Sequence, residues 1–67
     1  MMTIEKARSL FFLKDTDKVN IPSAEEMIQS RQAFQRQTLS WYERQKAQIE
    51  IDALKMLIDD ARKEEHK

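Results

Sequence analysis

The stretch from Ser23 to Lys63 runs for about 40 residues without a proline or a glycine, and this constrains the fold more than any other feature of the chain. Those two residue types most often end or break a helix. Glycine is absent from the whole chain, and Pro22 is the only proline. Because tight turns between strands depend on glycine, a sheet is hard to build from this sequence. We therefore predict an all-α fold with one long helix as its main element.

The long helix has a clear start signal. Ser23-Ala24-Glu25-Glu26 matches a capping box, in which the serine accepts a hydrogen bond from the third helical N–H and the last glutamate reaches back. Pro22 would lie just outside the helix, where it cannot disturb the hydrogen-bond ladder. The predicted helix covers about residues 24–63 and is about 60 Å long. An uninterrupted pattern of this length is typical of coiled coils and extended helical assemblies.

A shorter helix is predicted ahead of it, over about residues 4–14, with Thr3 as the candidate N-cap. In the connector, Val19 and Ile21 are expected to pack underneath. The predicted architecture is a single small helical domain with a short helix (1–14), a connector (15–22), a long helix (23–63) and a tail (64–67). We expect this helix-loop-helix chain to assemble as a coiled-coil-like dimer, antiparallel or parallel.

Apolar residues of the long helix fall on two faces of a helical wheel. The main stripe consists of Met27, Phe34, Thr38, Trp41, Tyr42, Ile49, Ala53 and Met56. A second stripe, on nearly the opposite side, consists of Ala47, Ile51, Leu54, Ile58 and Ala61. A helix that is apolar on two faces should be buried on two faces. Because the short first helix can cover only part of this surface, the remainder predicts a partner chain.

The size of the chain also favours self-association. A chain of 67 residues buries a small core and is marginal alone. There is no cysteine for a disulfide or a thiolate metal site, which leaves oligomerisation or very good helix packing as the source of stability. Two-fold dimers are the commonest oligomers. We predict a homodimer that associates through Ile49, Ile51, Leu54, Leu57, Ile58 and Ala61.

The middle of the long helix carries the candidate binding site for a different protein. Trp and Tyr are over-represented among the residues that dominate binding energies. The candidate residues are Phe34, Leu39, Trp41 and Tyr42. The competing interpretation is that these side chains form only the core or the dimer interface. We predict a non-enzymatic regulatory or inhibitory protein that acts by protein–protein binding. A structural scaffold, adaptor or assembly protein, with the long helix as a spacer, is the alternative.

A nucleic-acid-binding dimeric regulator is a third hypothesis. Residues 29–48 have a local charge of +3, because only Glu43 opposes four basic residues. The candidate contacts are Arg31, Arg36, Arg44 and Lys46. Arginine and glutamine also read base edges, and the segment contains several glutamines. Against this hypothesis, the arginines do not share one narrow stripe, and the apolar stripe runs through the same segment.

The sequence argues against catalysis, metals and cofactors. There is no cysteine, and the only histidine, His66, lies one residue from the end. Without glycine no phosphate-binding loop can form. The longest apolar run is residues 10–13, whereas a membrane span needs roughly 20 residues. A weaker alternative places residues 1–14 at a membrane surface. We predict a cytoplasmic protein. Its small size and cysteine-free composition are typical of bacterial or phage accessory proteins, although no motif identifies a family.

Overall fold

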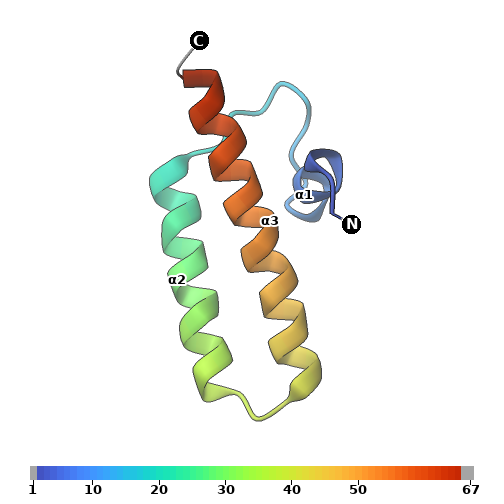
Figure 1. The fold of residues 1–67 in the computed structure, drawn as a ribbon, viewed down its shortest axis with the longest axis vertical. Helices are drawn as coiled ribbons and strands as arrows, with labels where there is room; N and C mark the ends of the chain where they lie inside the picture. Colours follow the sequence, from blue (N-terminus) through green and yellow to red (C-terminus); the bar gives the residue numbers. More distant parts are fainter. Residues whose placement is uncertain (1, 66–67) are drawn as a thin grey trace.

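The computed structural model describes residues 2–65, which form three helices and no strand. Helix α1 covers Ile4–Leu10, α2 covers Ile21–Gln37 and α3 covers Trp41–Glu65. Helices α2 and α3 lie side by side and antiparallel, as a hairpin, and α1 packs on the other side of α3 (Figure 1). The molecule is elongated, with extents of 42 × 22 × 18 Å. The predicted all-α fold is confirmed.

The prediction of one continuous helix over residues 24–63 is wrong. The chain leaves the helical conformation at Thr38, Leu39 and Ser40 and reverses direction there. The physical reason is burial: a straight helix would expose both apolar faces of residues 47–61 to water. By folding back, the chain covers one of those faces with its own residues 21–37.

The start of α2 also differs from the prediction. The helix begins at Ile21 rather than after Ser23, and Asn20 is its N-cap. The side chain of Asn20 accepts a hydrogen bond from the Ser23 N–H at 3.0 Å. Asn20 therefore takes the capping role predicted for Ser23, and Ser23 lies within the first turn of the helix. Pro22 therefore lies inside the first turn, where a helix does not need the missing N–H.

Helix α1 is shorter than the predicted 4–14, although it begins as expected. Thr3 is the N-cap, and its hydroxyl accepts a hydrogen bond from the Lys6 N–H. The helix ends at Leu10, so the connector to α2 covers residues 11–20 rather than 15–22.

A tight turn ends α1 and directs the chain back onto α3. The Phe12 N–H donates to the Ser9 carbonyl and the Leu13 N–H donates to the Arg8 carbonyl, which is the Schellman arrangement. This turn places Phe12 in the left-handed region at φ 56°, where glycine is usual. The conformation costs an L-residue roughly 1–2 kcal/mol. In return, Leu13 packs against the core.

The core lies on the two sides of α3. On one side, Ala53 and Leu57 pack against Ala7 of α1. On the other side, Leu54 and Ile58 pack against α2 and the end of the connector. Because alanine is small, α1 can approach α3 closely at Ala7 and Ala53. The expected two-sided burial of residues 47–61 is confirmed, and both sides are covered within one chain.

The connector contributes to both parts of this core. Phe11 and Val19 pack against the cluster on each side of α3, and Ile21 packs against the cluster shared with α2. The expectation that Val19 and Ile21 pack underneath the connector is confirmed. The guanidinium of Arg31 lies 5.7 Å from the centre of the Phe11 ring and 3.3 Å from the Glu50 carboxylate. Arg31 thereby connects α2 to the connector and to α3.

The hairpin can be tested with a pair of spin labels, since the chain has no cysteine of its own. Arg62 and Glu25 form a surface ion pair at 4.0 Å across the hairpin. We expect labels on Glu25→Cys and Arg62→Cys to give a short distance by electron paramagnetic resonance. One continuous helix would separate the same positions by about 56 Å. Dilution with unlabelled protein removes any contribution between chains.

Candidate protein-binding surface

The turn between α2 and α3 is held by side-chain hydrogen bonds instead of glycine. The Thr38 hydroxyl donates to the Glu43 carboxylate at 2.9 Å and accepts from the Ser40 N–H at 3.2 Å. The Ser40 hydroxyl accepts from the Glu43 N–H at 3.3 Å, which caps the start of α3. Ser40-Trp41-Tyr42-Glu43 thus matches the same capping pattern as the segment that begins at Ser23. This second match is the signal that could have located the break.

Two further side chains connect the turn to both helices. The Arg44 guanidinium donates to the Thr38 carbonyl at 2.9 Å. The Gln35 amide of α2 donates to the Arg44 carbonyl and to the Gln48 side chain of α3. These hydrogen bonds join the turn to both helices, so its shape does not depend on burying Leu39.

Three large apolar side chains are exposed at this end of the molecule. Leu39 is 93% exposed, Trp41 73% and Tyr42 70%. We call these three residues the tip surface. The turn that carries them lies at the end of the hairpin far from α1 and from both ends of the chain (Figure 1). Three of the four predicted partner-binding residues, which are neighbours in the sequence, are thus exposed at the same end of the molecule.

Phe34, the fourth, lies about one helical turn before the tip, and it is 44% exposed. It lines a shallow groove of about 380 Å³ between α2 and α3. The other lining residues are Ser30, Arg31, Glu43, Lys46, Ala47 and Glu50. Phe34 is thus a neighbour of the tip surface on the side of the hairpin rather than a member of it.

The hairpin near the tip contains very little core. None of residues 32–46 is buried, and Ala47 is the first buried residue of α3 after the turn. Apolar burial is the main source of folding stability. The tip half of the hairpin therefore depends on its hydrogen bonds, while its largest apolar side chains stay in contact with water.

The predicted self-association residues occupy different environments. Four of them are inside the chain's own core: Ile51, Leu54, Leu57 and Ile58. Ala61 is partly buried and Ile49 is about half exposed. Of these six residues, only Ile49 has a large apolar side chain that is exposed in the folded monomer. Self-association itself stays a prediction, but the four buried residues could join it only if α1 or α2 moved away.

Two of the four residues predicted to contact nucleic acid already interact with other groups of the same chain. Arg31 is partly buried and is paired with Glu50, and Arg44 is bonded to the turn. Arg36 and Lys46 are exposed, and neither takes part in an ion pair among residues 2–65. The basic segment therefore supports nucleic-acid binding less than its charge of +3 suggests.

Residues 2–65 contain no group of three or more acidic, histidine or cysteine side chains that could hold a metal ion. His66 lies outside the described residues. In that same part of the chain, no helix is long and apolar enough to span a membrane. Comparisons with protein-family models, with curated proteins and with solved structures found no match. The tip surface must therefore be interpreted from its own chemistry.

The cap at the tip gives a direct stability prediction. Ser40→Ala removes the acceptor for the Glu43 N–H and should lower the free energy of unfolding by about 1 kcal/mol. Ser23→Ala is the matched control: that serine is also the first residue of a capping pattern, but its hydroxyl caps nothing. We expect a change within about 0.5 kcal/mol for the control. Urea denaturation of both variants measures the difference, and equal losses would contradict the assignment of the cap.

Proposed function

We propose that this protein acts without catalysis, by binding another protein chain through the tip surface. One observation carries the proposal: Leu39 on the turn, and Trp41 and Tyr42 at the start of α3, are exposed where hydrogen bonds set the shape of the chain. Within the chain these side chains neither fill a core nor support the turn. Exposed apolar clusters usually mark interaction sites, and Trp and Tyr are common among the residues that dominate binding.

The charges around the tip indicate the chemistry of the partner. Arg36 and Lys46 are exposed near the turn, and neither takes part in an ion pair among residues 2–65. Glu43, the only acidic residue there, is already bonded to Thr38. Opposite charges at the rim of an interface speed association and orient the partner. We therefore propose a partner segment with apolar residues that cover the tip surface and acidic residues that face this rim.

A homodimer is the second part of the proposal. Among the described residues, eight apolar residues are buried, and four of them are alanines. Seven larger apolar side chains are exposed. A chain this short with so small a core usually needs an additional source of stability, such as oligomerisation. The coiled-coil geometry predicted for the dimer is not part of the proposal, because the helix that would form it is folded into a hairpin.

This protein's proposed biological role is that of a regulatory or inhibitory accessory protein of a bacterium or a phage, acting in the cytoplasm. The hairpin presents a small, preformed binding surface at one end, and preformed surfaces lose little conformational entropy on binding. Such a surface suits a protein that blocks or redirects a larger target. A scaffold or adaptor would need a second such surface for another partner.

The test compares Trp41→Ala with Gln45→Ala, an exposed residue one helical turn further along α3. A photo-reactive amino acid at position 39 first captures the partner in the host cell, and mass spectrometry identifies it. Binding of the purified partner is then measured by calorimetry. We expect Trp41→Ala to weaken the affinity at least about tenfold and Gln45→Ala to change it less than about twofold.

A second photo-reactive position keeps this experiment specific. Position 29 on α2 is exposed but is remote from the turn, so it should not cross-link to the same protein. Equal cross-linking at positions 29 and 39, or equal affinities of the two alanine variants, would rule out the tip surface as the binding site.

A further inference from the structure

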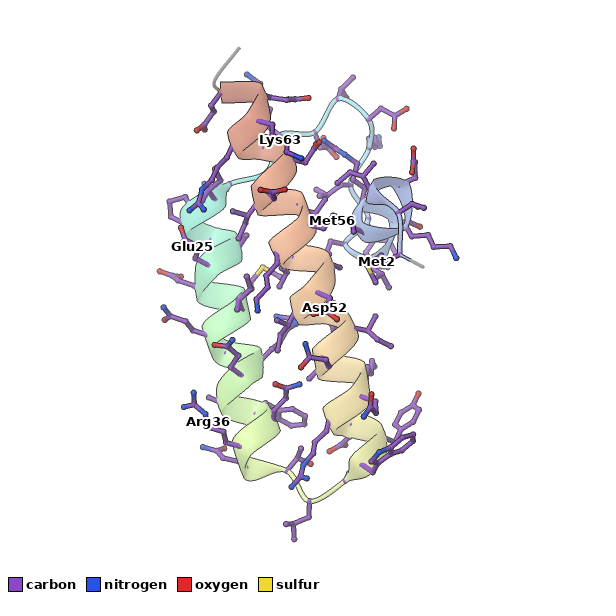
Figure 2. All side chains as sticks on the ribbon, in the orientation of Figure 1. Met2, Glu25, Arg36, Asp52, Met56 and Lys63 are labelled. Carbon is purple, nitrogen blue, oxygen red and sulfur yellow. The ribbon has the colours of Figure 1, made fainter. Side chains whose placement is uncertain are left out.

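The two ends of the molecule carry opposite charges, although the chain as a whole has a formal net charge of zero. Residues 29–50, around the tip, carry four basic and two acidic side chains. Residues 14–26 and 59–65 meet at the opposite end and carry eight acidic and four basic side chains (Figure 1). In Figure 2, Arg36 lies near the tip and Lys63 lies at the opposite end. We call residues 14–26 and 59–65 the acidic end.

The excess of acidic groups remains after the ion pairs of the acidic end are counted. Arg62 pairs with Glu25, and Lys63 pairs with Asp59. The other charged residues of this end belong to no ion pair among residues 2–65. They are Lys14, Lys18, Asp15, Asp17, Glu26, Asp60, Glu64 and Glu65. Six carboxylates therefore stand against two lysines.

A hollow of about 470 Å³ lies in the acidic end, between the connector and the last turns of α3. Five carboxylates line it: Asp15, Asp17, Asp60, Glu64 and Glu65. Arg8 and Lys18 are its basic lining residues, and the Arg8 guanidinium donates to two backbone carbonyls of the connector. Val19 and Ala61, both partly buried, provide an apolar lining. The hollow thus combines apolar groups with a negative charge, which is the chemistry proposed above for a partner of the tip surface.

The tip surface and the hollow share one face of α3. Tyr42 and Asp60 are 18 residues apart on this single helix, a separation of about five turns and about 27 Å. Helix α1 packs between these two positions, against Ala53 and Leu57, and so lies nearer the acidic end. Two copies can therefore lie antiparallel with these faces together. Because the spacing is the same in both copies, each tip then meets the hollow of the other.

We propose that the homodimer is antiparallel and that each copy covers the tip surface of the other with its acidic hollow. Arg36 and Lys46 of one copy face the carboxylates of the other. The contact occurs twice about a two-fold axis, which is the usual arrangement of a homodimer. The occupant is a second copy because both complementary surfaces are present on one molecule, at the spacing that an antiparallel pair needs.

This arrangement regulates binding at the tip. The tip surface cannot contact a second copy and another protein at the same time, so dimerisation and partner binding exclude each other. A higher concentration of the protein then favours the dimer and lowers the fraction of copies whose tip is accessible. The inference rests on both parts of the proposed function and adds the competition between them.

Trp41 is the only tryptophan of the chain, so its fluorescence reports directly on the tip surface. Sedimentation equilibrium gives the concentrations at which the wild type is monomeric or dimeric. Across that range, quenching of Trp41 by acrylamide should decrease as the dimer forms, because the hollow of the second copy excludes the quencher. The same dimer should weaken as salt is added, since exposed charges at its rim attract across the interface.

Charge reversals test the contact between tip and hollow. Glu64→Lys and Lys46→Glu should each raise the dimer dissociation constant about tenfold, because each change occurs twice in the dimer. The double variant should restore the dimer. Asp52→Lys is the control: Asp52 is exposed between the two ends, and the change in charge equals that of Glu64→Lys (Figure 2). It should alter dimerisation less than about twofold.

The outcomes separate this inference from the proposed function. A wild-type protein that is monomeric at every concentration overturns the homodimer and this inference together. A dimer in which Trp41 is quenched as readily as in the monomer, or which Glu64→Lys weakens no more than Asp52→Lys, overturns the interface alone. Assemblies that grow beyond the dimer overturn the two-fold arrangement. A complex of the intact dimer with the protein captured at position 39 overturns the competition and leaves the tip as a binding site.

Discussion

The structure depends on the burial of α3 on two opposite faces. Its C-terminal half carries apolar residues on both sides, and neither side can stay in water without a large loss of stability. Helix α1 covers one side and α2 covers the other, and the connector fills the space between them. The reversal at residues 38–40 and the strained turn at Phe12 are the two places where the chain bends to make this possible.

Much of this arrangement could be predicted from the sequence, because it follows from local patterns. The helical class follows from a composition without glycine, and the two apolar stripes predict two-sided burial. The break at residues 38–40 could not be read from periodicity. Phe34 and Trp41 are seven residues apart, which is the spacing of one face of a continuous helix, so the pattern itself gave no sign of a break. Neither proline nor glycine marks the break, because the hydroxyls of Thr38 and Ser40 supply the hydrogen bonds instead.

For the candidate site too, the sequence predicts what depends on neighbouring residues but not what depends on residues far apart in the chain. Residue type alone made Leu39, Trp41 and Tyr42 candidates, but the predicted continuous helix placed them midway along a rod rather than at the end of a hairpin. The basic residues were harder to interpret, since the main partner of Arg31 is Glu50, 19 residues away. The charge of +3 covers residues 29–48 and therefore leaves out Glu50, which pairs with Arg31 in the folded chain. The exposed charge is therefore smaller than the sequence suggests.

The two ends of the hairpin are stabilised by different forces, and this separates fold from function. Near α1, the helices are held by buried apolar side chains such as Ala53 and Leu57. Near the turn, none of residues 32–46 is buried, and polar side chains hold the helices together. Because Leu39, Trp41 and Tyr42 contribute to neither set of interactions, the fold does not determine their identity. The proposed binding role therefore places no demand on the residues that hold the hairpin together.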